Sequence, residues 1–308
     1  MRLVSFGPCG QERLGALIAG GEQILDLHAA DREIPATMLE FLRGDFWGKA
    51  RRVLADTLPG GCGDRQPVSK QPETLTRVSP RSRELVSVLE GVRLGAPVPH
   101  PGQIVCLGLN YKDHADEQGV AYPKAPLLFS KSPMAAAGPG DDVVYPDGVE
   151  QLDYEVELAV IMGRTAKRVP AAQARQYIAG YCVLNDVSAR CCQFGDKQWF
   201  RGKSFDTFAP CGPALVTPDE APDPHSLKLT CKVNGELRQN SNTNQLIHRI
   251  EDIIAYITRG ITLLPGDVIS TGTPSGVGVF FKPPRLLKRG DVVEAEIEGL
   301  GKLVNRIV

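Results

Sequence analysis

Apolar residues in the first part of the chain recur at short spacings that predict a β-hairpin followed by two short helices. These elements are expected over residues 13–19, 22–27, 35–42 and 46–58. Gly20 and Gly21 separate the first two runs, and glycine supplies the positive φ that a tight hairpin turn needs. Residues 59–83 are rich in Gly, Pro and polar side chains, which is typical of a linker. The pattern predicts a small α/β accessory domain and linker over 1–90, to which we assign no chemistry.

From about residue 99 the pattern changes to many short apolar runs separated by Gly, Pro and Asp. Strands are expected at 104–108, 127–130, 142–145, 154–162, 181–184, 213–216, 227–233, 267–271 and 292–297. Many short strands with few helices favour a sandwich or a roll over a doubly wound parallel sheet. The sequence therefore predicts an α+β fold that is mainly β, with its principal domain over residues 91–308.

One clear helix interrupts these strands. Ser241 or Asn242 is expected to cap it, because short polar side chains satisfy the free N–H groups of a first turn. Its apolar face recurs at helical spacing and consists of Leu246, Ile250, Ile253, Ile254 and Ile257.

Composition and charge exclude several classes of partner. The chain has 308 residues and a formal net charge of -1, and no basic block stands out, so neither nucleic acid nor a membrane surface is an expected partner. No apolar run is long enough for a membrane span, and the N-terminus lacks the apolar core of a signal peptide. None of the 8 cysteines forms a C-x-x-C pair, and the adjacent Cys191 and Cys192 cannot form an unstrained disulfide. We expect free thiols and a cytoplasmic protein.

A pair of glutamates within one apolar segment gives the strongest chemical signal. Residues 152–162 are expected to form one strand, on which Glu155 and Glu157 share a face with apolar neighbours. Two carboxylates about 7 Å apart on such a face repel each other and resist burial, and a hard divalent cation would offset both effects. Asp186 follows the next strand and would complete three oxygen ligands. The alternatives are a solvated strand face for the glutamates and an ordinary turn residue for Asp186.

Two further features suit acid–base chemistry. His114 and Glu117 are three residues apart in a helical segment, so a carboxylate would orient the imidazole and raise its basicity. Lys203 lies between aromatic residues, and a partly buried lysine stabilises an enolate or oxyanion. The alternatives are an exposed helix with a favourable charge pair, and a surface lysine whose stem covers apolar neighbours.

A glycine-rich loop follows the expected strand at 267–271. No Gly-Lys-Ser/Thr follows it and no suitable helix begins there, so it is neither a Walker loop nor a dinucleotide-binding fingerprint. Its exposed amides and the Thr273 hydroxyl would suit a substrate carboxylate. The alternative is a simple tight turn.

Five motifs together resemble the fumarylacetoacetate hydrolase superfamily. They are, in chain order, G-L-N-Y-x-x-H-x-x-E, D-x-E-x-E-L, N-D-V-S-A-R, G-K-S-F-D-T and G-D-V-I-S-T-G-T-P-x-G-V-G. The resemblance covers about residues 98–308 and is closest to the branch of fumarylacetoacetate hydrolase domain-containing protein 2 and bacterial diketo-acid hydrolases. It implies a C-terminal mixed β-roll as the catalytic domain, preceded by a small domain, and a homodimer.

Carried over to the matching positions, the resemblance also implies roles for individual residues. The implied ligands of Mg²⁺ or Mn²⁺ are Glu155, Glu157 and Asp186. The implied catalytic residues are His114 and Glu117, which activate water or move a proton, and Lys203, which supports an enolate or oxyanion. The implied substrate contacts are Lys131, Thr273, Asp206 and Thr207.

The resemblance leaves the reaction open. Our preferred reading is Mg²⁺- or Mn²⁺-dependent hydrolysis of a C–C bond in a small 2,4-diketo or acylpyruvate-type acid, through an enolate. The first alternative is an oxaloacetate tautomerase or decarboxylase, and the others are a ureidoglycolate lyase and an inactive metal-binding scaffold. In the namesake enzyme a further metal-ligand aspartate stands seven residues before the dyad histidine. That position is Leu107 here, so fumarylacetoacetate itself is not an expected substrate.

Overall fold

The N-terminal hairpin forms as the sequence predicts, and it continues into the large sheet of the molecule. The structure, a computed structural model, describes residues 1–57, 85–221 and 223–308. The N-terminal strands are β1 (Arg2–Phe6), β2 (Arg13–Ile18), β3 (Gln23–Asp26) and β4 (Val86–Val88), and the helices beside them are α1 (Leu27–Ala30), α2 (Met38–Arg43) and α3 (Trp47–Thr57). The predicted linker over 59–83 lies outside the described residues. Because β1 pairs with a strand of the C-terminal part, both parts share one sheet, and the domain boundary near residue 90 stays a prediction.

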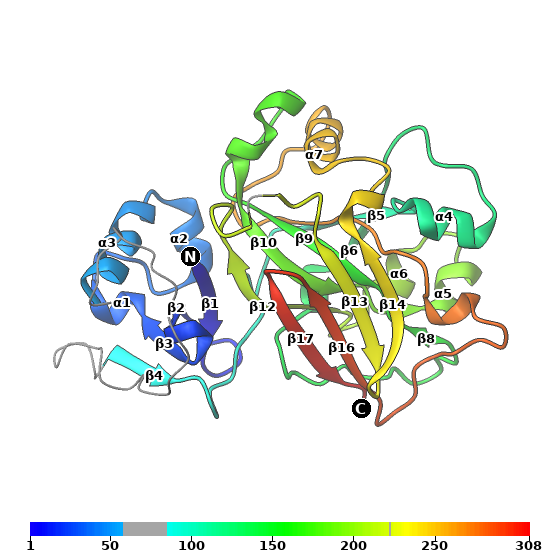
Figure 1. The fold of residues 1–308 in the computed structure, drawn as a ribbon, viewed down its shortest axis with the longest axis horizontal. Helices are drawn as coiled ribbons and strands as arrows, with labels where there is room; N and C mark the ends of the chain where they lie inside the picture. The colour runs from blue at the N-terminus through cyan, green and yellow to red at the C-terminus, as the bar shows by residue number, and fades with distance from the viewer. Residues whose placement is uncertain (58–84, 222) are drawn as a thin grey trace, which may run out of the picture.

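The large sheet runs through both parts of the molecule (Figure 1). Its order is β4-β3-β2-β1-β12-β10-β9-β15-β5-β6, with β7 beside β12. The C-terminal members are β5 (Ile104–Gly108), β6 (Leu127–Lys131), β7 (Ala136–Ala137), β9 (Val156–Met162), β10 (Ile178–Asn185), β12 (Ala209–Val216) and β15 (Val268–Ser270). Strands β5, β9 and β10 are buried along their whole length, which explains why they read as continuous apolar runs. Most pairs are antiparallel, but β15–β5 and β12–β7 are parallel, so the sheet is mixed.

A second sheet packs against the first and completes the predicted β-roll. Its order is β14-β13-β16-β17, with β13 (Lys228–Val233), β14 (Glu236–Asn242), β16 (Val292–Ile297) and β17 (Gly301–Arg306). Strands β16 and β17 lie against β10 and β12 of the large sheet (Figure 1). The fold is therefore α+β and mainly β, as predicted.

Four short helices and a two-stranded ladder lie around this roll. They are α4 (Lys112–Gln118), α5 (Arg190–Gly195), α6 (Phe200–Lys203), α7 (Ile250–Thr258), and β8 (Leu152–Asp153) paired with β11 (Ser188–Ala189). Among the described residues, no helix is both long and apolar enough to cross a membrane. Seven cysteines of the described part of the chain are free thiols, as expected.

The start of the predicted helix with the isoleucine face is wrong. Helix α7 begins at Ile250, and Arg249 occupies its N-cap position. Ser241 and Asn242 pair instead with β13, and the Asn242 side chain caps a short 3₁₀ turn over residues 243–245. Both residues lie too far ahead of Ile250 in the chain to cap the first turn of α7. The four predicted isoleucines of the helix are buried, and Leu246 is buried ahead of it.

Two strand predictions also need correction. Residues 142–145 form no strand; Val143 makes a single bridge to Ile307. The expected strand over 152–162 is divided into β8 and β9. At the break, the Glu155 N–H donates to the Asn185 side chain at 3.0 Å, and the next N–H donates to a glutamine side chain of β14. Side chains therefore take the hydrogen bonds that a neighbouring strand would have made.

Candidate active site

Two carboxylates of one segment and a third just after the following strand gather where β9 begins and β10 ends. Glu157 lies on β9, opposite Leu184 of β10, and Glu155 and Asp186 lie just beyond the ends of these strands. A carboxylate oxygen of each lies within 4.8 Å of the others, and all three side chains are buried. The solvated strand face that was the alternative for the two glutamates is therefore wrong.

Two of these carboxylates form ion pairs with buried cations. The Lys203 Nζ lies 2.7 Å from Glu155 Oε2 and 2.8 Å from Asp186 Oδ2, and Arg190 Nη2 lies 2.6 Å from Glu155 Oε1. Burial opposes the charge of Glu155, but Lys203 and Arg190 outweigh it and lower the pKa of Glu155 to about 2. Burial likewise opposes the charge of Lys203, and Asp186 and Glu155 still raise its pKa. Because Lys203 is 2% exposed, the surface-lysine alternative is wrong.

Glu157 is the carboxylate without a cationic partner among the described residues. Its Oε2 accepts hydrogen bonds from the Ser270 hydroxyl and from the Gly272 N–H at 2.8 Å, while its buried Oε1 has no partner there. Burial, Asp186 and Glu155 raise the pKa of Glu157 to about 8. A buried oxygen without a donor, in a set of three carboxylates, fits a hard divalent cation such as Mg²⁺ or Mn²⁺.

Lys131, a predicted substrate contact, has a different environment. Its side chain is fully buried, and Nζ donates to Asp186 Oδ1 and, at 3.1 Å, to the Val187 carbonyl. Burial lowers the pKa of this lysine. Lys131 does not line the cavity described below. Its contact with Asp186 therefore positions that carboxylate. The sequence showed an isolated lysine at a strand end and gave no sign of which carboxylate it meets.

The predicted dyad forms on α4. His114 Nδ1 lies 3.2 Å from Glu117 Oε2, and the Gly276 N–H donates to Glu117 Oε1 at 3.0 Å. Gly276 has a φ of +95°, and a Cβ there would clash with the Arg238 carbonyl, so this contact requires glycine. The His114 side chain is 9% exposed and its ring lies 5.8 Å from that of Phe280. The alternative of an exposed helix face is therefore wrong for His114, whereas Glu117 is exposed.

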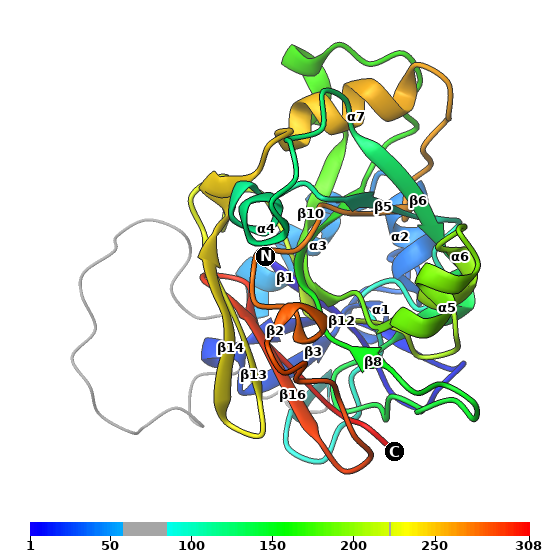
Figure 2. The same ribbon diagram turned by 90° about the vertical axis from the view of Figure 1, so that its right-hand side faces the viewer.

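One cavity of about 240 Å³ joins His114 of the dyad to two of the carboxylates, Glu155 and Glu157. Residues of α4, α5 and α6 contribute to its lining, and Figure 2 shows α4 on one side and α5 and α6 on the other. Its polar lining comprises His114, Gln118, Glu155, Glu157, Arg190, Gln193, Lys203 and Thr273. Its apolar lining comprises Leu107, Leu109, Val120, Leu127, Phe129, Phe194, Trp199 and Phe280. A wider groove of about 850 Å³, between the β13–β14 turn and residues 284–291, contains neither the carboxylate cluster nor the dyad.

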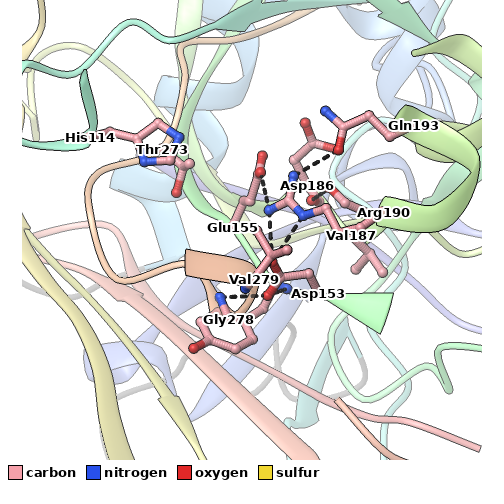
Figure 3. Close-up of polar contacts among 12 residues, drawn as sticks. His114, Asp153, Glu155, Asp186, Val187, Arg190, Gln193, Thr273, Gly278 and Val279 are labelled. Carbon is pink, nitrogen blue, oxygen red and sulfur yellow. Dashed lines mark hydrogen bonds and ion pairs between the residues drawn. The ribbon is translucent and has the colours of Figure 1, made fainter. Parts of the chain in front are cut away.

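Three of the four predicted substrate contacts are not in this lining. Besides Lys131, they are Asp206, which is exposed, and Thr207, whose hydroxyl accepts from the Val144 N–H at 2.9 Å. Thr273 does line the cavity (Figure 3). Its hydroxyl donates to the Val156 carbonyl at 3.0 Å and accepts from the Gln239 amide at 2.8 Å.

The amides of the glycine-rich loop contact protein carboxylates. The Gly272 and Gly276 N–H groups serve Glu157 and Glu117, and two further N–H groups of the loop donate to Asp153 at 2.7 Å and 3.0 Å. The expectation that free loop amides hold a substrate carboxylate is therefore wrong for these positions. The loop orients the carboxylates of the site instead.

Sequence reasoning missed the arginine at the centre of the site (Figure 3). Arg190, at the start of α5, contacts Glu155, donates from Nε to Asp153 Oδ2 at 2.9 Å and donates from Nη1 to Gln193 Oε1 at 2.9 Å. Asp153 in turn accepts the two loop amides, so one network joins β8, α5 and the loop. The signal was in the sequence, because Arg190 ends the N-D-V-S-A-R motif four residues after Asp186.

The fold and this constellation define an enzyme of the fumarylacetoacetate hydrolase family. The family model "Fumarylacetoacetate (FAA) hydrolase C-terminal" matches residues 103–308, and the chain belongs to this family. Among curated proteins, the chain is 45% identical over 318 residues to "Oxaloacetate tautomerase FAHD2B, mitochondrial" of Bos taurus, with all of this chain and 92% of that protein covered.

Solved structures agree in fold. The fumarylacetoacetate hydrolase of Exiguobacterium antarcticum is 35% identical with a TM-score of 0.79, covering 100% of this chain and 99% of that one. The maleylpyruvate hydrolase of Sphingobium sp. SYK-6 is 30% identical with a TM-score of 0.76, again covering 100% of this chain and 99% of that one. These relatives are named for an isomerisation and for two hydrolyses, so the family fixes the type of site and leaves the reaction to be argued.

Proposed function

We propose that this chain is a divalent-metal-dependent oxaloacetate tautomerase. The observation that carries the proposal is a cavity of about 240 Å³ that is lined both by His114 of the dyad and by Glu155 and Glu157 of the carboxylate cluster. The match over the full chain to a protein named as an oxaloacetate tautomerase favours this reaction over the hydrolysis that the sequence alone favoured.

The carboxylates Glu155, Glu157 and Asp186 would hold Mg²⁺ or Mn²⁺. When bound, the cation supplies Lewis-acid chemistry and orients a 2-oxo acid. Lys203 already bridges Glu155 and Asp186, so its ammonium group lies beside any negative charge that grows on the substrate oxygen.

The proton transfers fall to the dyad. Glu117 holds the imidazole of His114 through Nδ1, which leaves Nε2 to remove a proton from C3 of oxaloacetate. The electron pair of the broken C–H bond forms the C2=C3 double bond, and the 2-oxygen takes up a proton to give the enol. No C–C bond breaks. Phe129, Trp199 and Phe280 line the cavity, and an aromatic lining that keeps water from the substrate favours proton transfer over hydrolysis.

Hydrolysis of a diketo acid is the second candidate, and one observation favours it. The outer part of the cavity is lined by apolar side chains, including Val120, Leu127 and Phe194, which suit an apolar tail that oxaloacetate lacks. The same dyad would then activate water. By contrast, no observation favours a ureidoglycolate lyase, and an inactive scaffold does not need the complete set of His114, Glu117 and Lys203.

The choice between these reactions rests on one assay of chelator-stripped protein. We expect Mg²⁺ or Mn²⁺ to restore a rapid enol–keto conversion of oxaloacetate, followed by ultraviolet absorbance, with no pyruvate formed. Acylpyruvates and 2,4-diketo-3-deoxy sugar acids serve as the comparison. Metal-dependent cleavage of one of these, without tautomerisation of oxaloacetate, would replace the proposal with the hydrolase. Pyruvate release from oxaloacetate would instead identify a decarboxylase.

Metal binding itself is expected to stabilise the fold. A ligand present at about a hundred times its dissociation constant stabilises the native state by about 2.7 kcal/mol, which corresponds to a rise in melting temperature of roughly 5 °C for a chain of this size. Differential scanning fluorimetry with and without Mn²⁺ measures this shift. An unchanged melting temperature over the whole titration would contradict the metal site. We also propose that the protein is a homodimer with a cytoplasmic location, as expected from the sequence.

A further inference from the structure

Gln118 contacts the catalytic face of the dyad histidine. Its side-chain nitrogen lies 2.9 Å from His114 Nε2, and it lines the cavity beside that histidine. Gln118 is the last residue of α4 and lies four positions after His114, so the two side chains share a helix face. Gly119 follows in the left-handed conformation and ends the helix at this point. The contact is therefore built into the end of α4.

The chemistry of the three side chains fixes the proton on the ring. Glu117 is a carboxylate that accepts hydrogen bonds, so the His114 Nδ1 that faces it at 3.2 Å carries the hydrogen. In the neutral imidazole Nε2 is then an unprotonated acceptor, and its partner has to be a donor. The side-chain NH₂ of Gln118 is such a donor. In this tautomer the ring carries its lone pair on Nε2, on the side that Gln118 and the cavity share.

We propose that Gln118 is a positioning residue that holds the His114 lone pair on Nε2 in the resting enzyme and accepts from Nε2–H after proton transfer. The inference rests on the proposed function, because it takes His114 as the base. Substrate displaces the amide from Nε2. The C3–H bond then breaks, the proton forms the Nε2–H bond, and the electron pair passes to the C2=C3 double bond. Rotation of the Gln118 amide places its oxygen where its nitrogen was, and that oxygen accepts from Nε2–H until the proton moves on to the 2-oxygen.

Two substitutions separate this role from simple packing. Gln118→Glu keeps the size of the side chain but replaces a group that donates and accepts by one that only accepts, so it stabilises a hydrogen on Nε2. Gln118→Leu removes both functions and keeps a similar volume. A packing role predicts that the isosteric Glu variant is the milder change. The proposed role predicts the reverse, with kcat lowered about a hundredfold in Gln118→Glu and about tenfold in Gln118→Leu, and KM changed by less than about threefold in both.

The decisive readout does not depend on turnover. In ¹⁵N NMR spectra of the Mg²⁺-treated protein, the resonances of His114, assigned by their loss in a His114→Ala variant, distinguish protonated from unprotonated ring nitrogens. We expect an unprotonated Nε2 in the wild type and a protonated Nε2 in Gln118→Glu. The exposed Gln173 provides the matched control, because Gln173→Glu makes the same charge change on the surface and should leave spectrum and kcat unchanged.

The outcomes separate the two proposals. A protonated Nε2 in the wild type, or a Gln118→Glu variant with more activity than Gln118→Leu, overturns the role of Gln118. The expected spectra together with no tautomerase activity in any variant would leave that role standing and remove the proposed reaction. Melting temperatures of both variants within a few degrees of the wild type ensure that lost activity is not lost folding.

Discussion

Replacing Glu157 by glutamine is expected to abolish metal binding and oxaloacetate turnover together. Glu157 is fully buried, and its Oε1 is the oxygen of the cluster that has no donor among the described residues. Glutamine keeps the shape but removes the negative charge that a hard cation requires. Loss of Lewis-acid assistance worth several kcal/mol corresponds to a fall in kcat/KM of about a thousandfold or more. Isothermal titration with Mn²⁺ and the oxaloacetate assay measure the two effects.

The same substitution is expected to leave the metal-free protein at least as stable as the wild type. Burial, Asp186 and Glu155 raise the pKa of Glu157 from 4.5 to about 8 in the folded chain. The folded state therefore binds a proton that the unfolded chain releases, and this contribution to stability is lost as the pH rises from 4.5 to about 8. Glu157→Gln has no carboxyl group to titrate at that position, so its stability should not fall in this pH range for that reason. Thermal unfolding in chelator at several pH values tests this, and Glu298→Gln, at an exposed position, is the matched control.

For the metal-binding prediction, a Glu157→Gln variant that binds Mn²⁺ like the wild type would remove Glu157 from the ligand set.

The parts of the site that the sequence predicts well depend on local periodicity. His114 and Glu117 meet because residues three apart share a helix face. The strands that carry or flank Glu157 and Asp186 are apolar runs bounded by polar residues, and β9 and β10 form where those runs lie. For the same reason the mainly β fold could be predicted before the strand order was known.

The parts that the sequence does not predict depend on contacts between distant segments. Asp153 accepts amides from the loop at Gly278, which is 125 residues away, and Lys131 meets Asp186 across 55 residues. Neither contact produces a regular spacing of residues that could be recognised in the sequence. Lys131 was consequently interpreted as a substrate contact although it holds a carboxylate. The break between β8 and β9 has the same origin, because the Glu155 N–H donates to the side chain of Asn185, which lies at the end of β10.

Replacing His114 by alanine is expected to abolish turnover while metal binding is kept. Its ring contacts Glu117, Gln118 and Phe280, and it has no hydrogen bond or ion pair to Glu155, Glu157 or Asp186 among the described residues. General acid–base catalysis by a positioned side chain contributes about 10²- to 10⁴-fold, so kcat should fall by roughly that factor. The Mn²⁺-dependent rise in melting temperature should persist. The exposed His100 offers the matched control, and His100→Ala should retain wild-type kcat.

Together with Glu157→Gln, this variant separates two readings of the same cavity. If the carboxylates and the metal they hold were sufficient for tautomerisation, His114→Ala would keep most of its activity while Glu157→Gln lost it. If the dyad is the base, both variants lose turnover and only Glu157→Gln loses metal. Loss of Mn²⁺ binding in His114→Ala would contradict both, because it would make the imidazole a ligand. Among the described residues, the group close enough to share a metal ion is Glu155, Glu157 and Asp186, and it does not include His114.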